Sequence, residues 1–141
     1  MFTSISSRAA SAYKRVSVQT SVDGASPHQL VVLLYEALLA SLPKAARAIQ
    51  AQDVQSKSYE IGRSVRILEE GLLSGLNTQD GGEVAVNLRS LYAYCIQCLT
   101  RANVSNDAQK VAEVIALIEP VAQAWSQIGL IGNAVQPTAG V

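Results

Sequence analysis

The sequence predicts an all-α protein, namely an antiparallel up-down four-helix bundle preceded by a short N-terminal helix or an extended cap segment. Four long stretches carry apolar residues at alternating spacings of three and four, which is the pattern of amphipathic α-helices. The turns between them are short and polar, and short loops place consecutive helices antiparallel. Alternation typical of a strand occurs only at Val16, Val18 and Val22.

Residues 1–25 are rich in serine and alanine and hold too little apolar surface to fold alone. The run 7–15 could form a short helix with Tyr13 on its apolar side, and the valines that follow favour extended chain. Asp23-Gly24 is a turn signal before the first long helix. We therefore expect an N-terminal cap segment that docks on the bundle or stays mobile.

The first bundle helix is predicted to begin at Ser26-Pro27-His28-Gln29. Ser26 can cap the helix, Pro27 suits the first helical position, and Gln29 completes a capping box. The apolar pattern then continues to Ile49. Pro43 should bend this helix because it removes one backbone hydrogen bond.

The second helix is predicted to run from a cap at Asp53 to Leu76, with the apolar stripe on one side and charged residues on the other. The last helix is predicted over residues 107–129, with a kink at Pro120. From residue 130 the sequence has no period and no charge. The predicted organisation is a cap segment at 1–25, a bundle at 26–129 and a disordered tail at 130–141.

The stretch 77–103 carries more apolar surface than one contact face requires. The turn Asp80-Gly81-Gly82 opens into a stripe that includes Leu91, Cys95 and Cys98, and a second apolar set lies beside that stripe. This helix is therefore either the centre of the bundle or a helix that offers a face to a partner.

The composition excludes several classes of protein. Eleven basic and 11 acidic side chains give a net charge of zero, which argues against nucleic acid as the partner. Two mid-helix cysteines behave as small buried apolar groups, and such thiols suit a reducing compartment. The N-terminus lacks a signal-peptide core, and we expect no membrane insertion. These features indicate a cytoplasmic protein.

The sequence contains no set of residues typical of catalysis, a metal site or a cofactor site. His28 is the only histidine, which excludes a di-iron bundle with two Glu-x-x-His motifs. A phosphotransfer bundle stays open as an alternative, although Val32 stands where a lysine four residues after the histidine would be expected. A generic helical scaffold is the other alternative. We expect no enzyme.

An ordered series of short motifs resembles the FliS family of flagellar secretion chaperones for flagellin. The motifs are Ala12-Tyr13, Val18 with Thr20, Ser26-Pro27, Leu34-Tyr35-Glu36, Ala48-Ile49, Asp53, Asp80-Gly81-Gly82-Glu83, Asn87-Leu88, Leu91-Tyr92, Tyr94, Leu99, Ala102-Asn103 and Trp125. They span about residues 10–126. Glu36-Ala37-Leu38 departs from the Asp-Gly-Ala that the family usually has, and the extra bulk could alter packing of the N-terminal segment.

The resemblance implies a helical bundle that binds the disordered C-terminal segment of flagellin, prevents early polymerisation and delivers flagellin to the flagellar export gate. It also implies that the N-terminal segment covers part of the binding surface when the client is absent. The resemblance and the apolar excess together predict these partner-binding residues: Tyr13, Val18, Leu30, Leu34, Tyr35, Leu38, Asn87, Leu88, Tyr92 and Ile96. On the helix at 77–103, Leu91, Cys95 and Cys98 are assigned to the core. A homodimer of the client-free protein is left open.

Overall fold

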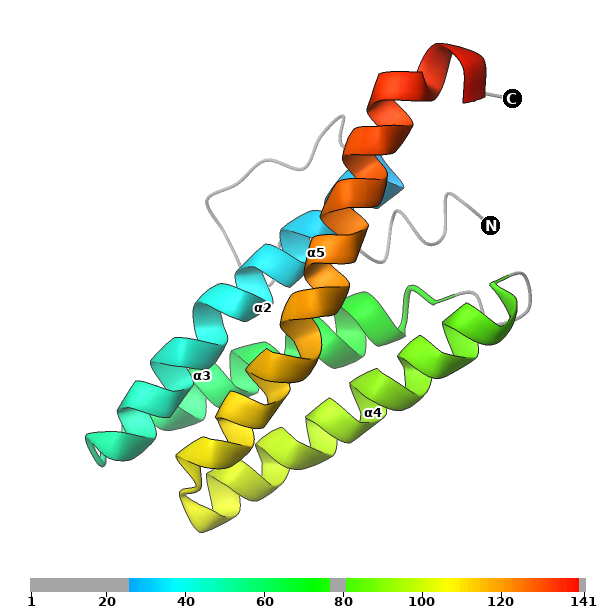
Figure 1. Ribbon diagram of the computed structural model, residues 1–141. Coiled ribbons are helices and arrows are strands. Elements are labelled where there is room, and N and C mark those ends of the chain that lie inside the picture. Colours follow the sequence, from blue (N-terminus) through cyan, green and yellow to red (C-terminus); the bar gives the residue numbers. More distant parts are fainter. Residues whose placement is uncertain (1–25, 77–80, 140–141) are drawn as a thin grey trace.

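The computed structural model describes the backbone of residues 26–76 and 81–139, and the side chains as far as residue 128. Within these residues the chain forms α2 (Pro27–Gln50), α3 (Val54–Arg66), the π-helix η1 (Ile67–Leu73), α4 (Gly82–Ser105) and α5 (Ala108–Ala139). The described part is helical without strands, and consecutive helices run antiparallel (Figure 1). The predicted all-α four-helix bundle is confirmed. The predicted cap segment at 1–25 lies outside the described residues.

The helix starts follow the predicted capping chemistry. The Ser26 hydroxyl accepts a hydrogen bond from the Gln29 backbone at 3.1 Å, and the Gln29 side chain accepts one from the Ser26 backbone at 2.8 Å. Asp53 caps α3 by accepting from the Ser56 backbone at 3.1 Å. These bonds satisfy backbone N–H groups that have no partner within a helix. Pro43 lies inside α2, which continues past it to Gln50.

The second predicted helix divides into two kinds of helix. α3 ends at Arg66, and the chain continues as the π-helix η1 from Ile67 to Leu73. The apolar residues Leu68 and Leu72 lie four apart and both face the core in η1. Their spacing suits an α-helix and a wider π-turn alike, so the apolar pattern could not separate the two.

The last helix is longer than predicted. The sequence placed its end near residue 129 and assigned disorder to residues 130–141, whereas the backbone of α5 is helical to Ala139 and projects past the other helices (Figure 1). Isolated glycines lower helix propensity by only about 1 kcal/mol each and do not block helical geometry. The end of this helix was therefore predicted about ten residues too early. The division of the chain into a bundle and a separate C-terminal tail stays a prediction.

The core lies between the helices, with α2 packed most extensively against α5 and α3. It is built from side chains that are less than one-tenth exposed, chiefly Leu34, Leu38 and Leu42 of α2, Ile67 and Leu68 of η1, Leu99 of α4, and Val111, Val114 and Ile118 of α5. Contrary to the expectation from the sequence, α2 is long and apolar enough to cross a membrane, by length and composition only. Its apolar side chains are instead the largest contribution to this core.

α4 and α5 lie close together at the turn that joins them and diverge toward their other ends (Figure 1). The turn is set by Asn106, whose backbone adopts the left-handed conformation that asparagine tolerates at a helix C-terminus. At the opposite end of α4, Gly82 has φ +61°, a conformation that favours glycine. The diverging ends carry much of the apolar surface described below.

Candidate interaction surface

A hydrogen bond between two tyrosine hydroxyl groups joins α2 to α4 inside the core. Tyr35 and Tyr92 are paired, and their side chains are 1% and 2% exposed. Burial, together with the neighbouring tyrosine, raises the pKa of Tyr35 far above its ordinary value. Burial also raises the pKa of Tyr92 to about 12. Both hydroxyls are therefore neutral, and the pair is a polar contact surrounded by apolar side chains.

The predicted partner-binding residues divide into two groups in the structure. Leu30, Leu34, Tyr35, Leu38 and Tyr92 are buried in the core. Asn87 is exposed, and Leu88 and Ile96 are half-buried against the core. Tyr13 and Val18 lie outside the described residues.

The assignment of faces on α4 is corrected by this burial. From the sequence, Tyr92 is expected to face a partner and Leu91 the core, whereas in the structure Tyr92 is buried and Leu91 is half-buried. Cys95 and Cys98 are buried as predicted. The five buried residues of the predicted site can contact a partner only if covering side chains move away, so their binding role stays a prediction.

α4 exposes a series of large apolar side chains. Val84, Val86 and Val104 are 68%, 50% and 79% exposed, and Tyr94 is also exposed. Half-buried apolar side chains also lie on these two helices, namely Leu88 and Leu91 on α4 and Leu117, Val121 and Trp125 on α5. We call the exposed residues Val84 and Tyr94, together with these five half-buried residues, the apolar surface; Val86, two residues after Val84, points to the other side of α4. Exposed apolar side chains gathered in this way typically mark an interaction site.

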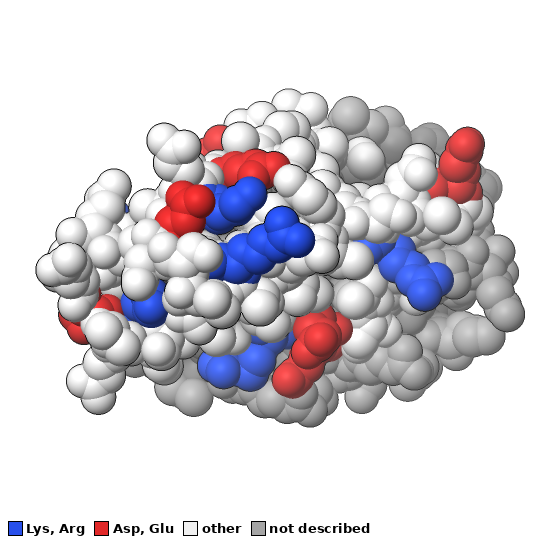
Figure 2. Space-filling view, turned by 90° about the horizontal axis from the view of Figure 1, so that it is seen from below, with Lys and Arg blue, Asp and Glu red and all other residues white. Residues whose placement is uncertain are grey.

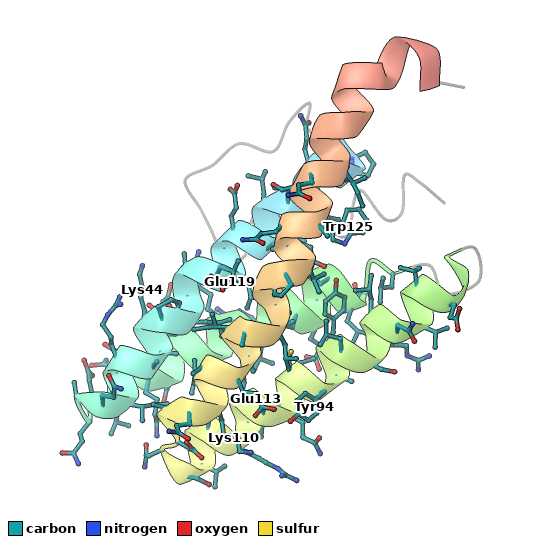
Figure 3. The ribbon with its side chains drawn as sticks, in the orientation of Figure 1. Lys44, Tyr94, Lys110, Glu113, Glu119 and Trp125 are labelled. Carbon is teal, nitrogen blue, oxygen red and sulfur yellow. The ribbon has the colours of Figure 1, made fainter. Side chains whose placement is uncertain are left out.

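Glu113 of α5 fixes the edge of this surface. Its carboxylate accepts a hydrogen bond from the Tyr94 hydroxyl and a weak one from the Cys98 thiol at 4.0 Å. Tyr94 and Glu113 point toward one another across the two helices, with Trp125 farther along α5 (Figure 3). The hydrogen bond to Glu113 raises the pKa of Tyr94 well above its ordinary value, because the neighbouring carboxylate holds the phenolic proton.

A lysine that sequence reasoning missed ties α3 to the end of α4. Lys57 is 8% exposed, and its ammonium group donates to the Asn103 carbonyl at 3.0 Å and to the Asn106 side-chain oxygen at 2.7 Å. A cation is favourable at a helix C-terminus. The sequence contained a sign of this contact, because Lys57 lies one turn before Ile61 and therefore on the apolar side of α3.

The structure brings together no catalytic set among the described residues. His28 is half-buried beside Trp125, with ring centroids 5.1 Å apart, and its Nε2 atom has no hydrogen-bond partner there. Among all residues that the structure describes, no group of three or more His, Cys, Asp or Glu side chains could hold a metal ion. Figure 2 shows basic and acidic side chains interspersed on one face rather than separated by sign. The fold is that of a helical bundle, and the apolar surface is its candidate interaction site.

Comparison with known proteins gives the particular family. Residues 9–131 match the family model described as Flagellar protein FliS. The chain is 41% identical over 117 residues to the flagellar secretion chaperone FliS of Salmonella typhimurium, covering 83% of this chain and 87% of that protein. It is 34% identical over 125 residues to FliS of Escherichia coli, covering 89% and 92% of the two chains.

A third relative is the flagellar secretion chaperone FliSB of Pseudomonas aeruginosa, which is 38% identical over 116 residues, 82% of this chain and 91% of that protein. The chain belongs to the FliS family of flagellar secretion chaperones. This is a family of chaperones and not of enzymes, which confirms the expectation of a non-catalytic protein.

Proposed function

We propose that this protein is a cytoplasmic export chaperone that binds the disordered C-terminal segment of flagellin. In binding it prevents premature polymerisation of flagellin, and the complex is then delivered to the flagellar type III export apparatus. The observation that carries the proposal is the apolar surface on α4 and α5 in a member of a secretion chaperone family. An amphipathic helix of the client would cover this surface with its apolar side.

The energetics require a surface of this kind. A disordered client loses conformational freedom when it folds on its partner, which costs about 2–5 kcal/mol or more of the interaction energy. Burial of one valine or leucine side chain contributes about 1.5–3 kcal/mol. Several side chains of the apolar surface must therefore be covered together before binding becomes favourable.

Two exposed valines give a matched test. Val84 on α4 and Val54 on α3 are both 68% exposed and both lie in the first turn of a helix. Val84→Lys introduces a charge into the apolar surface, whereas Val54→Lys introduces the same charge elsewhere. Calorimetric titration with a flagellin C-terminal peptide should show at least a tenfold weaker affinity for Val84→Lys, which is about 1.4 kcal/mol.

Val54→Lys should bind the peptide like the unsubstituted protein, and circular dichroism should show equal helicity in all three proteins. Equal weakening by the two substitutions would place the client elsewhere. Absence of binding by the unsubstituted protein would contradict the proposed function itself. Delivery requires a separate assay, namely flagellin secretion by cells that carry Val84→Lys. Size-exclusion chromatography over a range of concentrations would test for a client-free homodimer.

A further inference from the structure

One carboxylate lies beside the apolar surface on α5. Glu113 is half-buried, and Leu117 and Val121 follow it at intervals of four residues, which places all three on one side of that helix. Tyr94 of α4 points toward Glu113 and donates a hydrogen bond to its carboxylate (Figure 3). Both residues are nearer the α4–α5 turn than the rest of the apolar surface, so the carboxylate marks that end.

The partners of this carboxylate are neutral groups. Among the described residues, it accepts a hydrogen bond from the Tyr94 hydroxyl and a weak one from the Cys98 thiol at 4.0 Å. Lys110 lies three residues earlier in α5 and forms no ion pair with it in the described structure. The negative charge at this end of the apolar surface is therefore held by hydrogen bonds and is not matched by a cation of the described chain.

A partner that covers the apolar surface also removes water from this carboxylate. A helix lying on Leu117 and Val121 reaches the side of α5 that carries Glu113. Loss of hydration opposes binding unless a cation of the partner takes the place of water. A lysine or arginine there supplies that cation and a charge-assisted hydrogen bond. The carboxylate therefore distinguishes between partners whose apolar sides are alike.

We propose that Glu113 makes the apolar surface selective for an amphipathic helix that carries a lysine or arginine beside its apolar side, at the end nearer the α4–α5 turn. The basic side chain pairs with the Glu113 carboxylate, and the hydrogen bond from Tyr94 holds that carboxylate in position. The occupant is the C-terminal segment of the client, and this identification rests on the proposed function.

Calorimetric titration of the full chain with the flagellin C-terminal peptide tests the charge. Glu113→Gln removes the charge but keeps an amide oxygen that can accept from Tyr94. Its affinity should be about tenfold lower, which corresponds to loss of a hydrogen bond between charged groups. Glu119→Gln is the matched control and should bind like the unsubstituted protein. Glu119 is exposed on α5, and six residues after Glu113 it lies on another side of the helix (Figure 3).

A set of peptides, each with one lysine or arginine replaced by glutamine, locates the partner charge. One of them should bind the unsubstituted protein about tenfold more weakly and lose no further affinity for Glu113→Gln, because both substitutions remove the same pair. Added salt should weaken that pair as well. Additive losses for every peptide, or equal affinities of Glu113→Gln and Glu119→Gln, would overturn the proposal.

Tyr94→Phe separates the charge from the group that positions it. Phenylalanine keeps the ring but donates no hydrogen bond, so binding should weaken while the preference for the peptide with the basic residue remains. Loss of that preference would contradict a direct contact with Glu113. If the peptide binds and Glu113→Gln has no effect, the proposed function stands and the charge selection fails. If the peptide does not bind the unsubstituted protein, both fail.

Discussion

Replacement of Lys57 by methionine should destabilise the bundle by about 1–3 kcal/mol. Methionine keeps most of the buried stem of this side chain but removes the ammonium group. The Asn103 carbonyl and the Asn106 side chain then lose a charged donor at 3.0 and 2.7 Å. The expected cost is that of leaving a part-buried acceptor unpaired, with a contribution from the C-terminal end of α4.

The opposing effect is desolvation, since a buried ammonium group loses hydration that methionine does not need. We expect the lost hydrogen bonds to exceed this gain, because both acceptors are in good geometry and one is a helix-terminal carbonyl. The variant Asn106→Gly measures the contribution of one acceptor by itself. Glycine accommodates the left-handed backbone but has no side chain that can accept a hydrogen bond from Lys57. The double variant should lose less stability than the two single losses summed.

Urea denaturation followed by circular dichroism measures the free energy of unfolding for each variant. Lys44→Met is the control, because Lys44 is exposed on α2 (Figure 3) and its loss should change stability by at most about 0.5 kcal/mol. The reasoning would be refuted if Lys57→Met changed the free energy of unfolding no more than Lys44→Met does. A more stable Lys57→Met would show that desolvation is the larger effect.

Three further predictions follow from burial and capping. Burial raises the pKa of the Cys95 thiol from about 9 to about 12, and that of Tyr92 from about 10 to about 12. Because the folded state favours the neutral forms, urea denaturation should show stability that falls as the pH rises from about 9 toward 12; a rise in that window would contradict these pKa directions. Cys95 and Cys98 are both buried, so Ellman's reagent should label them quickly only after unfolding, and fast labelling of the folded protein would contradict their burial. Ser26→Ala should lower the free energy of unfolding by about 0.5–2 kcal/mol through loss of the α2 cap, and no change would show that the capping box contributes nothing.

The local features of the sequence predicted most of the fold. The capping box at Ser26 and the cap at Asp53 act within three residues, so their chemistry is readable along the chain. Apolar spacing fixed the number of helices, and short turns fixed their antiparallel order. The same spacing could not distinguish the π-helix Ile67–Leu73 from an α-helix, because both turns leave the same leucines facing the core.

The candidate site depended on contacts that no local pattern contains. Periodicity shows that a helix has an apolar side, but it gives no information on which other helix covers that side. Tyr35 and Tyr92 lie 57 residues apart, and only the tertiary structure pairs them and places both in the core. Lys57 and Asn106 meet in the same way at a separation of 49 residues.

The stretch at 77–103 illustrates the boundary between the two kinds of information. Its sequence alone established that the helix has more apolar surface than one face needs. The tertiary structure decided that Tyr92, Cys95 and Leu99 are buried, whereas Val84, Val86 and Val104 are exposed. The physical reason is that hydrophobicity is a property of each side chain, whereas burial is a property of what packs against it.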